Sequence, residues 1–222
     1  MQEGEFLSIV SHELKTPIAV ITGLADTLFE RRHNLTDEQI DDCLARISRQ
    51  GDRLARLVAD LLDLSQVESG QLRVTLEPVN LAGTAQRALD NAPSPPGKSV
   101  ELIIPELLSA AADPNRLEQV LVNLLTNAYR YGGSTVRLEA HGTRDGVLVT
   151  VADDGGGVPD ELVPKLFERF ARGPSADGVG GSGLGLAIAR ALVEGFGGRI
   201  WYEPGHPAGA RFYFLLPAVE VA

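Results

Sequence analysis

The chain begins with two long segments in which apolar residues recur every three or four positions. The first covers residues 5–30, and its apolar residues are Phe6, Ile9, Val10, Leu14, Ile18, Ile21, Leu24 and Leu28. This spacing places them on one face of a helix. The second segment follows Thr36, which has capping-box spacing with Gln39. We therefore predict two long helices joined by a short turn.

The apolar face of the second segment is too wide for a two-helix hairpin to cover. Ile40, Ile47, Leu54 and Leu61 recur every seven residues, Cys43, Leu57 and Leu64 occupy the alternate seam, and Leu44, Val58 and Leu62 widen the face. A face of this width indicates that a second copy of the chain completes a four-helix bundle. Residues 1–70 are thus expected to form an all-α antiparallel helical hairpin that is a homodimer.

The pattern changes after residue 70. Short β-rich runs occupy 72–76, 99–104, 135–140, 147–152, 199–203 and 211–216, with helix-like segments at 80–91, 113–131 and 184–196. Mixed strands and helices predict an α+β sandwich in which a mixed sheet carries helices on one face. We expect this second domain to span 71–222, with "NAPSPPGKS" as a surface loop.

Charge and composition narrow the function. The net charge is -10, and both predicted domains carry more acidic than basic residues, which argues against general binding to nucleic acid or anionic lipid. No apolar run approaches the roughly 20 residues of a membrane span, and the N-terminus lacks the order of a secretion signal. Cys43 is the single cysteine. We expect no internal disulfide, a reducing compartment and a cytoplasmic location.

The stretch "SHELKTP" sets a histidine beside a glutamate inside the first predicted helix. Pro17 lacks a backbone N–H, so the Glu13 carbonyl loses its helical partner and a kink is expected. His12, Glu13, Lys15 and Thr16 lie mainly off the apolar face and should be exposed to water. A neutral imidazole is a nucleophile, and a neighbouring carboxylate can hold the proton of its other nitrogen. Taken alone, the stretch also fits a surface histidine beside a helix-favouring glutamate.

Two amides lie one turn apart in "NLLTNAYRY". Asn123 and Asn127 share one face of a helix whose other side is apolar, at Leu117, Val120, Leu121, Leu124 and Leu125. Amides are costly to bury without partners. An amide oxygen, phosphates and water suit Mg²⁺.

Two glycine-rich stretches complete the pattern. "VTVADDGGGVP" follows a strand, so backbone can approach a flat ligand while an aspartate accepts hydrogen bonds, although an ordinary turn has the same composition. "GVGGSGLGLAIAR" opens the last predicted helix, where free N–H groups favour an anion. The spacing of Gly178, Gly180 and Gly183 also fits a dinucleotide fingerprint, but no strand precedes it.

Five motifs in order carry a family resemblance. "SHELKTP", "NLLTNAYRY", "DDGGGVP", "LFERFAR" and "GGSGLGLAI" resemble the phosphoacceptor, asparagine, first glycine, phenylalanine and second glycine motifs of sensor histidine kinases. The resemblance covers nearly the whole chain. It implies the cytoplasmic core of such a kinase, with an ATP-binding domain of the kind shared by gyrase, Hsp90 and MutL.

The resemblance assigns roles to individual residues. It implies that His12 is the phosphoacceptor, Glu13 its proton acceptor, Asn127 the magnesium ligand, Asn123 a residue that positions that ion or its water, and Asp153 the reader of adenine. The other implied nucleotide-contacting positions are Arg130, Tyr131, Gly155, Gly157, Arg169, Arg172, Gly181, Gly183, Leu184 and Gly185.

The resemblance also implies a lid over the nucleotide, and this chain departs from the family motifs at two positions. Phe167 and Phe170 are expected to anchor a lid over 159–182. Asp154 replaces the usual asparagine and adds negative charge near the nucleotide, which should weaken affinity. Arg130 replaces the commoner lysine and retains the cation.

The implied function is ATP-dependent autophosphorylation on His12, with transfer to an aspartate of a response regulator receiver domain. Thr16, one turn after His12, is implied to orient water for dephosphorylation of that partner. Related ATPases carry a glutamate base where this chain has Asn123, so ATP hydrolysis should be slow. Two alternatives remain: a nucleotide-binding scaffold or switch without transfer, and a serine kinase or ATPase of the same superfamily.

Overall fold

The computed structural model describes residues 3–69, 74–171 and 182–219. The chain divides into two compact units, Met1–Ser65 and Gln66–Ala222. In the described part, no helix combines the length and apolar character needed to cross a membrane.

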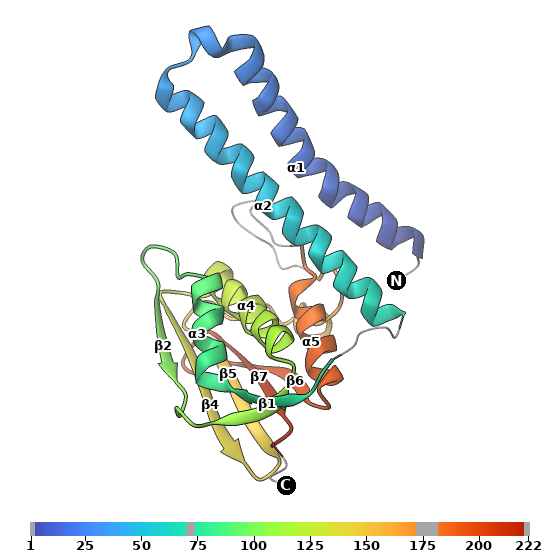
Figure 1. Cartoon of the computed structure of the whole chain (residues 1–222), viewed down its shortest axis with the longest axis vertical. Coiled ribbons are helices and arrows are strands. Elements are labelled where there is room, and N and C mark those ends of the chain that lie inside the picture. Colours follow the sequence, from blue (N-terminus) through green and yellow to red (C-terminus); the bar gives the residue numbers. More distant parts are fainter. Residues whose placement is uncertain (1–2, 70–73, 172–181, 220–222) are drawn as a thin grey trace. The chain divides into compact units, whose positions relative to one another are not determined.

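The first unit is an antiparallel helical hairpin (Figure 1). Helix α1 (Glu3–Arg31) is followed by a short 3-10 turn, η1 (Arg32–Asn34), and by α2 (Asp37–Glu68). The Thr36 N–H donates to Gln39 Oε1 at 3.0 Å, and the Gln39 N–H donates to Thr36 Oγ1 at 3.3 Å. These reciprocal bonds confirm the capping box that begins the second helix.

The second unit contains a five-stranded mixed sheet covered on one face by three helices (Figure 1). In sheet order the strands are β2 (Ser99–Ile103), β4 (Thr135–Thr143), β5 (Gly146–Asp153), β7 (Ala210–Leu216) and β6 (Arg199–Pro204). The helices are α3 (Leu81–Asn91), α4 (Pro114–Tyr131) and α5 (Gly185–Gly195). Strand β2 is parallel to β4, and the other pairs are antiparallel. The predicted fold class is confirmed for the hairpin and for this α+β unit.

The prediction of a strand at 72–76 is wrong, because the described residues 74–76 are not in a strand. The first strand is β1 (Glu77–Asn80), which pairs with β3 (Ser109–Ala112). Strand β3 was not predicted, because its sequence "SAAA" has neither β-branched nor aromatic residues. Its Ala110 and Ala112 are fully buried, so tertiary packing decides the conformation of this segment.

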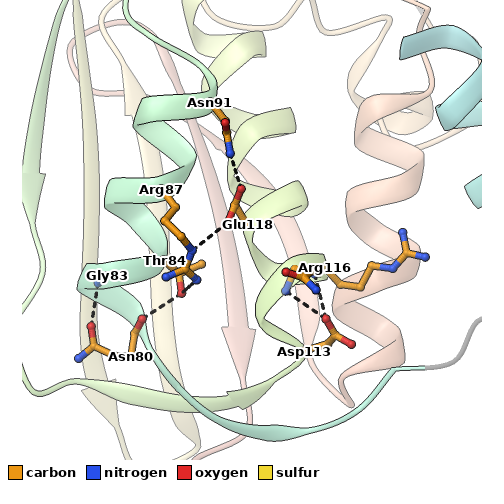
Figure 2. Close-up of polar contacts among 9 residues, drawn as sticks. Asn80, Gly83, Thr84, Arg87, Asn91, Asp113, Arg116 and Glu118 are labelled. Carbon is orange, nitrogen blue, oxygen red and sulfur yellow. Dashed lines mark hydrogen bonds and ion pairs between the residues drawn. The ribbon is translucent and has the colours of Figure 1, made fainter. Parts of the chain in front are cut away.

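Polar contacts fix α3 and α4 against each other (Figure 2). The side chains of Asn80 and Asp113 cap the two helices by accepting backbone N–H bonds. Glu118 of α4 accepts from Arg87 Nε at 3.0 Å and from Asn91 Nδ2 at 2.6 Å, both on α3. Helix α4 is therefore held at its start and along its α3 side.

The apolar side of α4 forms part of the core. Its most buried residues are no more than 3% exposed: Leu117, Val120, Leu121, Leu124, Leu125 and Ala128. This burial sets the rotation of the helix, so the half-buried Asn123 and Asn127 lie at the edge of the buried face.

Candidate active site

The candidate phosphoacceptor lies on an exposed part of α1. The His12 side chain is 80% exposed, and its Nδ1 lies 3.8 Å from Glu13 Oε1. Helix α1 continues through Pro17. The Thr16 hydroxyl donates to the His12 carbonyl at 3.1 Å, one turn back along the helix. The imidazole is therefore accessible, with a carboxylate beside one nitrogen.

The expectation that Glu13 faces water with His12 is wrong. The Glu13 side chain is only 11% exposed, and its Oε2 lies 3.6 Å from a guanidinium nitrogen of Arg53 on α2. Glu13 is one turn before the buried Pro17 and therefore shares its face of α1. Arg53 was not predicted, because only the pairing of the two helices brings it to Glu13. The carboxylate thus lies between an imidazole and a cation.

The Asn123 side chain connects helices α4 and α5 of the second unit. Its amide Nδ2 donates to the carbonyl of Gly185, the first residue of α5, at 3.2 Å. A Cβ at Gly185 would lie 3.5 Å from the Asn123 amide. The asparagine motif and the second glycine motif therefore meet in the structure.

Asn127 lies one turn after Asn123 and is half-buried. Its side-chain amide makes no hydrogen bond to any residue that the structure describes, so the side-chain oxygen is available to a ligand. Among those residues there is also no group of three or more His, Cys, Asp or Glu side chains able to hold a metal ion. A single amide oxygen suits Mg²⁺ where phosphates and water supply the rest of its shell.

Asp153 ends β5 and is held by backbone donors. Its Oδ1 accepts from the Gly155 N–H at 2.9 Å and from the Ala210 N–H at 3.4 Å. Burial is the main influence and raises the pKa of Asp153; the two backbone bonds lower it, Asp154 raises it and Lys98 lowers it. The other carboxylate oxygen accepts no hydrogen bond within the described part of the chain. It can accept one from a ligand.

Glycines are required around Asp153. A Cβ at Gly155 would lie 2.6 Å from Gly132 Cα and 2.8 Å from the Tyr131 carbonyl oxygen. Gly157 has a φ of +77°, in the left-handed region that favours glycine. Any larger residue at position 155 would push the end of α4 away from Asp153.

Asp154 is engaged by the start of β4. Its carboxylate accepts from the Thr135 N–H at 2.8 Å and from the Ser134 hydroxyl at 3.2 Å. The Thr135 bond is the main reason why its pKa is lowered. The side chain therefore organises the loop before β4, a role that its sequence position did not indicate. Its expected effect on nucleotide affinity stays a prediction.

Arg130 and Tyr131 end α4 as exposed residues. The Arg130 guanidinium carbon lies 6.0 Å from the centroid of the Tyr131 ring, and the Tyr131 side chain is 47% exposed. This distance is at the limit of a cation–π contact. Both residues can reach a ligand without first leaving a buried position.

Phe167 and Phe170, in the described part of the predicted lid, both contact other segments of the second unit. The Phe167 ring, two residues after the short turn η2 (Val163–Lys165), packs edge-on against Phe212 of β7 with centroids 6.4 Å apart. The Phe170 N–H donates to the Gly183 carbonyl at 2.8 Å. Arg169 lies between the two phenylalanines and is half-buried.

The second glycine motif is only partly described. Arg172 and Gly181 lie outside the described residues, as do Gly178 and Gly180. Gly183 has a φ of +71°, and a Cβ there would lie 2.8 Å from Phe170 Cα. The Leu184 side chain is fully buried. The Leu184 side chain therefore cannot reach a ligand, and its backbone N–H donates to the Ser182 hydroxyl at 3.2 Å.

Family models match both units. Residues 2–70 match the His Kinase A (phospho-acceptor) domain, and residues 112–220 match the histidine kinase-, DNA gyrase B-, and HSP90-like ATPase. The chain belongs to the histidine kinase family. The two matched domains, in this order, make it a protein-histidine kinase core, as the five motifs implied.

Individual histidine kinases are similar over most of this core. The circadian input-output histidine kinase CikA of Synechococcus elongatus is 32% identical over 225 residues, which are 97% of this chain and 30% of that protein. Sensor protein KdpD of Mycobacterium tuberculosis is 36% identical over 206 residues, 87% of this chain and 23% of that protein. The chain thus spans less than a third of the length of either relative.

Solved histidine kinase structures have the same fold. Acinetobacter baumannii AdeS gives a TM-score of 0.73 at 25% identity, covering 94% of this chain and 98% of that one. Full-length ShkA in complex with AMPPNP gives 0.68 at 31% identity, covering 98% of this chain and 47% of that one.

Proposed function

We propose that this kinase core phosphorylates His12 from ATP and passes the phosphoryl group to an aspartate of a response regulator receiver domain. The observation that carries the proposal is the pairing, in one chain, of an exposed histidine beside a carboxylate with a second candidate site along α4. There the Asn123 side chain bonds to Gly185 of the second glycine motif, and the end of the helix lies against Asp153 and Gly155 of the first. A surface histidine of no function would not need that second site.

The second unit would bind the nucleotide. Asp153 would accept from the exocyclic amino group of adenine, a role supported by the backbone bonds that hold one of its oxygens and leave the other for a ligand. Asn127 would ligate Mg²⁺, which when bound neutralises phosphate charge, and Asn123 would fix the ion's surroundings. The further nucleotide-contacting residues would be Arg130, Tyr131, Gly155, Gly157, Arg169, Arg172, Gly181, Gly183, Leu184 and Gly185.

The transfer step uses both imidazole nitrogens. Nε2 of neutral His12 attacks the γ-phosphorus in line, the bond to the bridging oxygen of ATP breaks, and ADP leaves. The imidazole gains positive charge as the new P–N bond forms, and Glu13 accepts the proton from Nδ1. Arg53 holds the Glu13 carboxylate in place from the neighbouring helix.

Asn123 favours transfer over hydrolysis. An amide cannot accept a proton from water at neutral pH, and the Asn123 side chain is already bonded to Gly185. The γ-phosphoryl group would therefore be kept for His12 rather than lost to water.

The domains would be residues 1–70, for dimerisation and phosphotransfer, and residues 71–222, for nucleotide binding. The hairpin would form a four-helix bundle with a second copy of the chain. Large apolar side chains on both of its helices support this, being 43–91% exposed in a single chain: Ile18, Phe29, Leu44, Val58 and Leu62. The site of action would be the cytoplasm.

Thr16 would give the kinase a phosphatase activity toward its partner. Thr16 is exposed on α1, and its hydroxyl, which donates to the His12 carbonyl, retains lone pairs that can orient a water. A phosphoaspartate is already reactive, so orientation of the water is sufficient.

The test is intact-protein mass spectrometry after incubation with ATP and Mg²⁺. We expect a gain of one phosphoryl group that is lost in acid and kept in base, as a phosphoramidate should be. A variant with Asp153→Ala is the control and should gain none at limiting ATP. ATP binding without any mass gain would instead favour the scaffold, and an acid-stable gain would favour a serine kinase.

A further inference from the structure

A tight turn organises the loop before β2. The Lys98 N–H donates to the Pro95 carbonyl at 3.1 Å, and Gly97 has a φ of +83°. Pro96 and Gly97 thus occupy the two central positions that a type II turn prefers. The Ser94 hydroxyl donates to the Lys98 carbonyl at 2.8 Å and closes the loop. Lys98 therefore leaves the turn in a defined direction.

The Lys98 side chain ends at the carboxyl end of α4. Its Nζ donates to the Gly132 carbonyl at 2.7 Å, in a half-buried position. Gly132 is the residue that follows the last turn of α4. A cation is favoured at this negative end of the helix dipole, and a charge-assisted bond of this length is a strong one.

Gly132 in turn lies against Asp153. A Cβ at Gly132 would lie 2.6 Å from Asp153 Cβ and 2.5 Å from the Ala128 carbonyl oxygen. A Cβ at Gly155 would lie 2.6 Å from Gly132 Cα. Neither glycine leaves space for a side chain beside the aspartate, so a shift of the Gly132 backbone toward Asp153 would displace Asp153 or Gly155.

Lys98 is also the cation that acts on Asp153. Among the described residues, the charged groups that influence this carboxylate are Asp154, which follows it on the chain, and Lys98, from the loop before β2. Burial raises the pKa of Asp153 most, and Lys98 opposes that rise. Without the lysine, Asp153 would become protonated at a higher pH.

We propose that Lys98 is a positioning residue for base recognition: it holds the Gly132 carbonyl so that Asp153 stays placed and charged to accept from the amino group of adenine. The proposal rests on the proposed role of Asp153. Lys98 itself touches no reacting atom.

The experiment compares the affinities of AMPPNP and GMPPNP for the full chain by calorimetry. With Lys98→Met the preference for the adenine nucleotide should fall about threefold to tenfold, because a charge-assisted bond is lost beside Asp153. Lys98→Arg should restore most of the preference. Arg144→Met is the matched control, since it removes an exposed cation of the same unit and should change nothing.

A pH series separates this role from a general loss of structure. As the pH is lowered from 7, the ratio of the Kd of Lys98→Met to that of the unmodified chain should rise, because the variant loses the Asp153 charge first. Ionisation of the nucleotide cancels in this ratio. Lys98→Gln, which keeps a donor for Gly132 without the charge, should show the same pH trend with a smaller loss of preference, and it serves if the Met variant does not fold.

Unchanged base preference and an unchanged pH profile in both uncharged variants would overturn the proposal. A base preference that falls only in proportion to a lower Tm would also overturn the proposal. Asp153→Ala distinguishes a failure of the proposed function of Asp153 from a failure of the proposed role of Lys98. If it keeps the preference, the proposed function of Asp153 fails; if it loses the preference while the Lys98 variants keep theirs, only the role of Lys98 fails.

Discussion

Asp153 carries a charge where burial disfavours it. Its pKa is raised in the folded chain, so the stability linked to this group is fully present below the unfolded pKa of about 3.9 and is lost as pH rises through the folded pKa. Asp153→Asn should therefore raise the Tm at pH 7, with the gain vanishing near pH 3, while base preference falls about tenfold or more. A variant less stable than the unmodified chain at pH 7 would contradict this reasoning.

Tyr129 carries a buried hydroxyl that has no hydrogen-bond partner among the described residues. In the described part of the chain its Oη has no hydrogen bond, and burial raises the pKa of the phenol. Removing an unpaired buried hydroxyl should be neutral or stabilising by up to about 1 kcal/mol. Tyr129→Phe is thus expected to match or exceed the unmodified chain in urea unfolding, with exposed Tyr131→Phe as control. A clear loss of stability would mean that the hydroxyl binds an ordered water.

Thr16 offers a separation of activities. With Thr16→Ala, autophosphorylation and transfer should stay within about twofold, because within the described residues the hydroxyl bonds only to the His12 carbonyl. Dephosphorylation of the partner should instead slow about tenfold or more. The measurement is the decay of a phosphorylated receiver domain mixed with the chain. Thr16→Ser, which keeps the hydroxyl, should retain the activity. Equal decay with all three proteins would leave Thr16 a structural role alone.

The site residues that the sequence predicts and the contacting residues that it does not predict differ in how they are specified. His12, Asn127 and Asp153 lie in local motifs, so their types and spacing indicated them. Arg53 and Lys98 act on residues 40 and 34 positions away, Glu13 and Gly132 respectively. Such contacts depend on the pairing of elements, which no local pattern contains.

At the scale of elements, periodicity predicted the helices well but did not predict the short strands β1 and β3. The predicted helices at 80–91, 113–131 and 184–196 match α3, α4 and α5 within two residues at each end, because each has an apolar stripe and a clear start. Strands β1 and β3 have four residues each. A pair so short is stabilised by its neighbours rather than by its own sequence.

The hairpin carries the prediction about assembly. On α2, Val58 is 43% exposed and Leu62 is 61% exposed, one turn apart on the same face. If this face packs against a second copy, Leu62→Glu should weaken the dimer by about tenfold or more, because a charge would be buried without a partner. Sedimentation measures the change. Ala45→Glu, at an exposed position of the same helix, introduces the same charge and should leave the dimer intact.

At the scale of the whole molecule, the proposed phosphoacceptor and the proposed nucleotide site belong to different compact units. His12 lies in the unit Met1–Ser65, and Asn127 and Asp153 lie in the unit Gln66–Ala222. Since His12 lies outside the unit that holds Asn127 and Asp153, a change at His12 should leave nucleotide affinity intact. We therefore expect a single substitution to separate nucleotide binding from phosphoryl acceptance.

The most direct test of the central claim uses ATP labelled in the γ-phosphate, with the unmodified chain and with His12→Gln. We predict that the unmodified chain takes up base-stable label, and that His12→Gln binds ATP with the same Kd yet takes up none. Label retained by His12→Gln, with ATP binding unchanged, would contradict the assignment of His12 as the phosphoacceptor.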